Sequence, residues 1–166
     1  MNGTRCALDG CSFRYASDES ADGVERGVHA IDHVSLQARA GEVVMLVGRS
    51  GCGKTTVTRL LNGLAPEYFR GSLHGEARVG GLHAGVAAVE DYATEVGSVF
   101  QNPKTQYFHA NSTDELAFPC ENAGMEPSEI RRRIRERLRA FDVEHLHDRN
   151  IVDCSGGQQQ QLAVVA

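Results

Sequence analysis

Hydrophobic and polar positions divide the first part of the chain into two strands and a polar connection. Residues 4–15, around "CSFRY", and residues 28–39, around "HAIDHVSLQA", are predicted to form strands of a small antiparallel unit. The stretch between them, "ASDESADGVERG", is polar and contains glycine, which is typical of a surface loop. The pattern therefore predicts an antiparallel β unit near the start of the chain.

The next apolar run is continuous rather than interrupted. Gly41–Gly48, "GEVVMLVG", has the unbroken apolar character of a strand buried on both faces. It leads into a segment with apolar residues at helical spacing, Val57, Leu60, Leu61 and Leu64. Gly63 is a predicted end of this helix. Glu95–Pro103, "EVGSVFQNP", is predicted to be another buried strand, which the Asn-Pro turn ends.

The rest of the chain changes from strand-like to helical spacing. Residues 71–93 are predicted to be a short strand followed by an irregular, Gly-rich connection. From Asp114 the pattern is helical. Pro127 and Ser128 open an amphipathic helix with its apolar side chains on one stripe, Ile130, Ile134, Leu138 and Phe141.

Composition restricts the class of protein. The 166 residues are enough for one ordinary domain with a sizeable core, and 41% hydrophobic and 23% charged residues are typical of a soluble globular protein. No apolar run approaches the roughly 18 residues of a membrane span, and Met1–Asp9 lacks the pattern of a secretory signal. The formal net charge of −5 provides no general attraction to nucleic acid or acidic lipid.

Cysteine and histidine residues do not form the pattern of a disulfide framework or a zinc site. The cysteines are odd in number and include no CxxC pair, which favours a reducing cytoplasm: Cys6, Cys11, Cys52, Cys120 and Cys154. Two histidine pairs, His29 with His33 and His145 with His147, have spacings that allow metal ligation, but we interpret them as surface polar residues.

One Gly-rich segment carries a motif with a defined chemistry. "GRSGCGKT" fits G-x-x-x-x-G-K-[ST] and lies between a predicted buried strand and a helix, as a phosphate loop requires. Its glycines let backbone N–H groups surround a phosphate at the positive end of a helix dipole. Lys54, one of two lysines beside fifteen arginines, supplies a compact charge to the outer phosphates, and the Thr55 hydroxyl ligates Mg²⁺. The predicted nucleotide-binding residues are Gly48, Arg49, Ser50, Gly51, Cys52, Gly53, Lys54, Thr55 and Thr56.

The segment "CSGGQQQQLAVVA" gives the motif a family context. Cys154–Gln158 resembles the L-S-G-G-Q signature of ATP-binding-cassette (ABC) ATPases, with Cys in place of Leu. In that family the signature of one subunit closes over ATP held by the phosphate loop of the other. The resemblance assigns this role to Ser155, Gly156, Gly157 and Gln158. It also makes the glutamine run the first turn of a helix, with Leu162–Ala166 as its buried continuation.

Two further positions match the family by order and spacing. Gln101 falls at the end of the predicted strand, where the family's Q-loop glutamine reaches Mg²⁺ and the attacking water and senses the transmembrane partner. The alternative is a plain turn residue. Tyr15 matches the aromatic residue that stacks on adenine. Phe13 is the alternative candidate for this role, and the alternative interpretation of Tyr15 is a residue that only packs within its strand.

Several stretches resemble a narrower group, the ATPases of energy-coupling-factor importers, which take up vitamins, cobalt or nickel. These are "LLNGLAPEYFRG", "VFQNPKTQYF", "STDELAFPCENAG" and "EHLHDRN". The resemblance implies that Asn102–Phe108 lines a groove for coupling helices of a membrane subunit. Cys154, Gln161 and Pro119 depart from the usual Leu, Arg and Gly. Cys154 and Gln161 lie at the signature. Either they make the signature of this subunit degenerate, and the partner subunit carries a better one, or the family tolerates these changes.

One predicted helix is rich in arginine, with Arg131, Arg132, Arg133, Arg135, Arg137 and Arg139. It fits either a nucleic-acid-binding stripe or a solvated face interleaved with Glu129 and Glu136. We favour the solvated face, because the apolar stripe is intact, no aromatic residues interleave and the chain is acidic.

The resemblance also identifies what the family requires beyond these motifs. The Walker B strand ending in Asp, the Glu that orients water and the switch His are absent after Gln101. We therefore expect this to be the N-terminal part of a longer protein. The 166 residues alone are expected to bind nucleotide poorly, to hydrolyse it negligibly and to aggregate.

The sequence thus predicts an α/β P-loop ATPase core, incomplete, with an antiparallel β flank and an α-helical subdomain. The expected divisions are residues 1–110, 111–154 and 155–166. The expected function is that of an ATP-binding subunit, peripheral at the cytoplasmic face of the membrane, that uses MgATP to drive solute uptake. Its expected partners are a second ABC ATPase subunit and a transmembrane subunit, without nucleic acid. The alternatives are a soluble, non-transport ABC ATPase and a truncated, non-catalytic fragment.

Overall fold

The computed structural model describes residues 4–16 and 29–166. Most of the expected polar loop at 16–27 lies outside the described residues. Contacts divide the chain into two compact units, Met1–Ser98 and Val99–Ala166. The three-part division expected from the resemblance stays a prediction. Within the described residues, none of the helices has the length and apolar content needed to cross a membrane.

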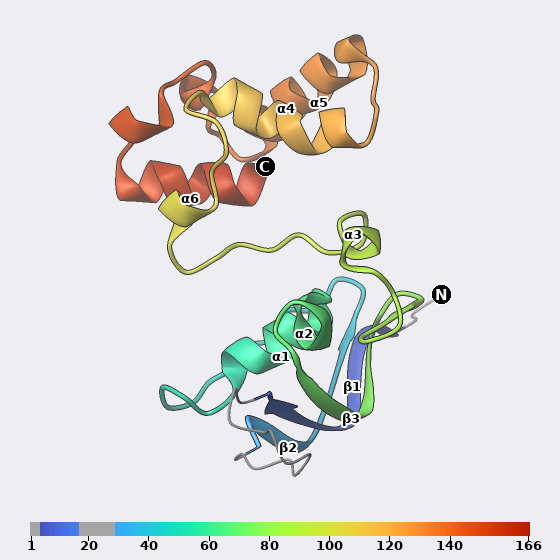
Figure 1. The fold of residues 1–166 in the computed structure, drawn as a ribbon. Coiled ribbons are helices and arrows are strands. Elements are labelled where there is room, and N and C mark those ends of the chain that lie inside the picture. The colour runs from blue at the N-terminus through green and yellow to red at the C-terminus, as the bar shows by residue number, and fades with distance from the viewer. Residues whose placement is uncertain (1–3, 17–28) are drawn as a thin grey trace. The chain divides into compact units, whose positions relative to one another are not determined.

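A twisted antiparallel sheet forms the base of the N-terminal unit (Figure 1). Its strands are β1 (Thr4–Tyr15), β2 (Ile31–Arg39), β3 (Gly71–Val79) and β4 (Leu82–His83), in the order β2-β1-β3-β4. The predicted antiparallel pairing is confirmed, since Phe13 of β1 lies opposite Ile31 of β2 and Leu73 of β3. The strand expected at the start of residues 71–93 is β3.

Three helices accompany this sheet: α1 (Lys54–Leu61), α2 (Leu64–Glu67) and α3 (Val89–Tyr92). Helix α1 packs against the sheet because Val57 and Leu60 share one face of the helix and are buried. The core that they join consists of Leu8, Cys11, Phe13, Ile31, Ala65 and Ala77. The predicted helix end is confirmed, since α1 ends one residue before its C-cap, Asn62, and Gly63 follows with a φ of 75°.

The two predicted buried strands are wrong. Among the described residues, neither Gly41–Gly48 nor Glu95–Pro103 forms a strand, and Val43, Met45 and Val47 are 80–93% exposed. A strand needs hydrogen-bonded neighbours on its edges and packed layers on its faces. The run Gly41–Gly48 pairs with none of the four strands of the described sheet, so it lacks these neighbours.

The C-terminal unit is helical, with α4 (Ser112–Asn122), α5 (Pro127–Ala140) and α6 (Gly156–Val165) (Figure 1). Short 3₁₀ turns lie at Pro103–Thr105, Glu144–Leu146 and Ile151–Asp153. The helices enclose a core of Leu116, Ile130, Ile134, Leu138, Val143, Leu146, Ile151, Leu162 and Val165. The helical pattern predicted from Asp114 is confirmed and begins at Ser112, because Asn111 caps the helix by accepting a hydrogen bond from the Thr113 N–H at 2.7 Å.

One residue of the predicted stripe on α5 does not belong to it. Ile130, Ile134 and Leu138 are buried, but Phe141 is 51% exposed. The helix ends at Ala140, and Phe141 is its C-cap with non-helical backbone angles. The helical periodicity that would have turned this ring inward has therefore already ended.

Candidate nucleotide site

The predicted phosphate loop connects an exposed segment to the first turn of α1. Lys54 is the first residue of that helix. Its ammonium group donates hydrogen bonds to the carbonyl oxygens of Gly48, at 2.8 Å, and Arg49, at 2.7 Å. The Cys52 N–H donates to Arg49 O at 3.3 Å and forms a turn. The lysine side chain therefore folds back and closes the loop around its own ammonium group.

Two glycines make this backbone path possible. Gly51 and Gly53 have φ values of +80° and +94°, in the left-handed region that glycine occupies without steric cost. At Gly53 a Cβ atom would also lie 2.6 Å from Ile31 Cγ2 and would overlap the Ala30 carbonyl oxygen. A larger residue at Gly53 would therefore displace α1 from the start of β2.

The start of α1 suits an anionic ligand. The cap residue Gly53 makes no side-chain hydrogen bond to the helix, and the first turn of α1, all of it described, carries no acidic residue. Neither the cap residue nor the first turn of α1 therefore compensates the partial positive charge of the helix N-terminus. With the Lys54 ammonium beside it, the donor set fits a phosphate group.

Tyr15 is brought to the same helix from the end of β1. Its hydroxyl lies 3.1 Å from Thr56 Oγ1 and accepts a hydrogen bond from Arg59 Nη1 at 3.0 Å. The Tyr15 side chain is half-buried, whereas Phe13 is fully buried in the core. Of the two candidate rings, Tyr15 therefore retains exposed surface, and Phe13 is a packing residue.

The magnesium ligands expected from the resemblance, Thr55 and Gln101, belong to different units. Both are exposed, and each offers a neutral oxygen, which suits Mg²⁺ when phosphates and waters complete the shell. Their pairing at one ion stays a prediction. Among the described residues, no group of three or more His, Cys, Asp or Glu side chains is placed to hold a metal ion.

The signature segment forms a capped helix start, as its sequence suggests. Ser155 Oγ accepts from the Gln158 N–H at 3.3 Å, and Gln158 Oε1 accepts from the Ser155 N–H at 2.9 Å. This reciprocal pair is a capping box. A Cβ atom at Gly156 or Gly157 would meet no described atom within 4 Å. Packing among the described residues therefore does not explain why glycine stands at these positions.

Replacing Ser155 by alanine is expected to destabilise the C-terminal unit by about 1 kcal/mol, because the Gln158 N–H loses its acceptor. Urea denaturation followed by circular dichroism measures this change. Ser155→Asp is the matched control, since a carboxylate also caps a helix and its charge suits the N-terminus. Equal stability of the Ser155→Ala and unsubstituted proteins would contradict the role of the cap.

The glutamine run lies in a helix, as predicted, but one of its glutamines is buried and the segment that follows is only partly buried. Gln159 is 4% exposed; its Nε2 donates to Ile151 O at 2.8 Å, and its backbone oxygen accepts from the Tyr107 hydroxyl. Burial, together with the nearby Glu115 carboxylate, raises the pKa of Tyr107 to about 12, so the phenol keeps the proton that it donates. The buried continuation predicted at Leu162–Ala166 is interrupted by Val164, which is 50% exposed. Sequence reasoning placed Tyr107 in the groove stretch Asn102–Phe108 but missed its contact with the buried Gln159.

A pocket of about 360 Å³ lies beside this buried glutamine. Its lining is Lys104, Tyr107, Phe108, His109, Ala110, Ile151, Val152 and Gln159. Phe108 and Val152 are each 78% exposed. Gln159 Oε1 has no hydrogen-bond partner among the described residues. Glu115 supports the rim, since its Oε2 accepts from the N–H groups of Phe108 and His109.

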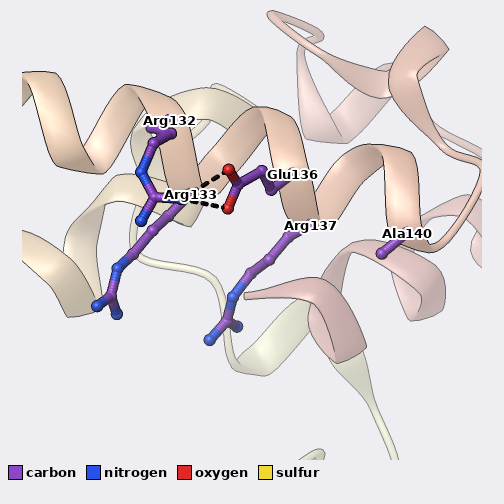
Figure 2. Close-up of a pocket in the computed structure, with 5 residues that line it drawn as sticks. All are labelled: Arg132, Arg133, Glu136, Arg137 and Ala140. Atoms are coloured by element: carbon purple, nitrogen blue, oxygen red, sulfur yellow. Dashed lines mark hydrogen bonds and ion pairs between the residues drawn. The ribbon is translucent and has the colours of Figure 1, made fainter.

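The arginines of α5 are partly neutralised within the helix, as Figure 2 shows for Arg132 and Glu136. Arg132 also pairs with Glu129 at 2.7 Å, and Arg133 pairs with Glu129 at 2.8 Å. Hydrogen bonds from Arg132, and to a smaller extent from Arg133, lower the pKa of Glu129 to about 2. Arg137 donates to the Val165 carbonyl oxygen at 3.0 Å. These pairs support the interpretation of this face as a solvated one.

Comparison with known proteins decides the family. A family model described as ABC transporter matches residues 31–166. The chain belongs to this family. Its members are ATPases that bind ATP, generally with Mg²⁺, so the predicted superfamily and P-loop fold are confirmed.

Individual relatives agree with this assignment. A protein of Treponema denticola described as an ABC transporter ATP-binding protein is 36% identical over 96% of this chain and 31% of its own length. A similarly described protein of Pyrococcus horikoshii is 35% identical over 96% of this chain and 53% of its own. The chain thus spans between about a third and about a half of these relatives.

A solved structure shares the fold. It is cbiO1 from Clostridium perfringens, described as part of the ABC transporter complex cbiONQ. The TM-score is 0.79 at 23% identity, and the match covers 99% of this chain and 61% of that one. The α/β ABC ATPase architecture expected from the sequence is therefore present, although the strand at Gly41–Gly48 is not formed.

Proposed function

We propose that the whole protein is the ATP-binding subunit of an energy-coupling-factor-type importer, which binds and hydrolyses MgATP at the cytoplasmic face of a membrane to drive solute uptake. The observation that carries the proposal is the closed phosphate loop, in which Lys54 lies at the start of α1 and the first turn of this helix carries no acidic residue. The likeness to cbiO1, whose structure is described as part of a transporter complex, supports the narrower assignment.

In this proposal different residues of the chain contact the phosphates, the adenine base and the magnesium ion of MgATP. Lys54 leaves its loop carbonyls to contact the outer phosphates, and the first N–H groups of α1 donate to them. Tyr15 stacks on adenine. Thr55 and Gln101 hold Mg²⁺, which neutralises phosphate charge when bound, and Gln101 also orients the attacking water.

The signature segment serves a second ATPase subunit, identical or not. Glycine at 156 and 157 is not required by the described packing, but it allows another surface to approach the backbone closely. The capped start of α6 presents N–H groups and carries no acidic residue in its described first turn. This set suits the phosphates of ATP held by the partner subunit. Cys154 packs against the helical core and fills the place of the usual leucine.

The pocket beside Gln159 is the proposed docking site for the transmembrane subunit. Its exposed ring at Phe108 and exposed Val152 are apolar surface that a partner segment would bury. These residues include the end of Asn102–Phe108, the stretch that the resemblance assigns to this contact.

Phe108→Asp tests the docking site. The whole protein and its membrane subunit are co-expressed, and their association is measured in detergent or nanodiscs. We expect the carboxylate to weaken association at least tenfold, because a charge is buried in an apolar contact, while MgATP binding is unchanged. The matched control is Phe141→Asp, which changes an exposed ring of the same unit that does not line the pocket.

Unchanged association in Phe108→Asp would contradict the docking site. ATP turnover that is the same with and without any membrane subunit would favour the soluble, non-transport ABC ATPase. Absence of MgATP binding in the whole protein would favour the non-catalytic alternative.

A further inference from the structure

We infer that Arg59 is a positioning residue for the nucleotide base: it holds the Tyr15 ring at a set distance from the phosphate loop. This inference rests on the proposed nucleotide site. The geometry that carries it is a chain of contacts from Phe69 through Arg59 to Tyr15, anchored on the helix that begins with Lys54.

Arg59 contacts Tyr15 at its hydroxyl end. Its Nη1 donates to the Tyr15 hydroxyl at 3.0 Å, while its Cζ lies 5.8 Å from the ring centroid. The guanidinium is therefore much closer to the hydroxyl than to the ring face. Arg59 can therefore restrain the direction of the ring through its hydroxyl group.

Arg59 is itself held from the other side. Its Cζ lies 3.6 Å above the centroid of the Phe69 ring, a stacked cation–π arrangement for which a planar guanidinium is well suited. Phe69 is partly buried against the N-terminal core, and its N–H donates to Leu64 O at 2.8 Å. The donor to Tyr15 therefore starts from a fixed support.

Tyr15 depends on such a restraint because it is the last residue of β1. The Phe13 ring meets it edge-to-face, with centroids 4.9 Å apart and planes at 86°. Thr56, which is 4% exposed, contacts the hydroxyl at 3.1 Å. The polar contacts at the hydroxyl add to the packing of the ring against the N-terminal core and fix its end beside α1.

Helix α1 connects the base platform to the phosphate loop. Lys54, Thr56 and Arg59 all belong to this eight-residue helix, and five residues of α-helix span roughly 7.5 Å. The ring that receives the base and the lysine that receives the phosphates are therefore attached to one rigid element. Loss of Arg59 should affect base stacking and leave phosphate binding intact.

The test is Arg59→Met in the whole protein, with equilibrium affinities measured for MgATP and for magnesium tripolyphosphate, which has no base. We expect MgATP affinity to fall about five- to tenfold, part of the effect of losing a base–aromatic stack. Tripolyphosphate affinity should stay within about twofold. A purely structural role would lower both affinities together, and an unchanged MgATP affinity would also overturn the inference.

Two further variants, Tyr15→Phe and Arg59→Lys, test whether the effect of Arg59→Met comes from the lost contact with the Tyr15 hydroxyl. Tyr15→Phe keeps the ring and removes the hydroxyl, with its contacts to Arg59 and Thr56. The double variant should lose no more MgATP affinity than Tyr15→Phe alone, because Tyr15→Phe has already removed the contact with Arg59. Arg59→Lys keeps a cation and a donor and should retain more MgATP affinity than Arg59→Met. Additive losses in the double variant would contradict the positioning role. Failure of the unsubstituted protein to bind either ligand would overturn the proposed function instead.

Discussion

Replacing Lys54 by alanine in the whole protein is expected to weaken MgATP binding about a hundredfold or more. The ammonium group makes two hydrogen bonds to loop carbonyls and belongs to the first residue of α1. Transfer of these donors to phosphate oxygens gives charge-assisted bonds, each contributing about 1.5–3 kcal/mol. Two of them correspond to a factor of a hundred or more in affinity. Isothermal titration calorimetry with MgATP measures the change.

The matched control for this prediction is Arg135→Ala. Arg135 is exposed on α5, so its removal changes the net charge by the same amount without touching the phosphate loop. We expect its MgATP affinity to stay within about twofold of the unsubstituted protein. An equal loss in the two variants would mean that overall charge, rather than the loop, determines binding.

Replacing Phe13 by alanine is expected to destabilise the N-terminal unit by about 3–5 kcal/mol, because the change removes a fully buried ring and leaves a cavity in the core. The cluster around it draws on the sheet, α1 and α2, so the cavity cannot close by the movement of one element. Urea denaturation followed by circular dichroism would detect an early transition of this unit.

Phe141→Ala serves as the control, since this ring is 51% exposed at the end of α5. Its loss should cost about 1 kcal/mol or less, in the range of surface substitutions. Equal destabilisation by the two changes would contradict the assignment of Phe13 to the core. It would also reopen Phe13 as the alternative to Tyr15 in base stacking.

Features that depend on nearby residues were predictable from the sequence. The phosphate loop needs glycine at particular steps and a lysine at the helix start, and both requirements are met within Gly48–Lys54. The capped start of α6 needs Ser155 and Gln158, three residues apart. The buried stripe of α5 follows from helical spacing. In each case the interacting groups lie within about two turns of chain, so the order of residues is sufficient.

Features that depend on distant residues were not predictable in this way. The apolar run Gly41–Gly48 reads as a buried strand, but burial requires strands and helices on its edges and faces, and Val43 is 93% exposed among the described residues. The contact of Arg59 with Tyr15 joins residues 44 positions apart, and that of Tyr107 with Gln159 joins residues 52 apart.

The sequence by itself thus determined the local chemistry of this protein: a phosphate-binding turn, a capped glycine-rich helix start and the family to which they belong. Only the tertiary structure decided which side chains support that chemistry. It left Tyr15 half-buried and Phe13 fully buried, placed Arg59 between Tyr15 and Phe69, and left Gln159 Oε1 unpartnered at a pocket among the described residues. The physical reason is that burial and long-range hydrogen bonds depend on which elements meet in space, and apolar character along the chain does not specify that meeting.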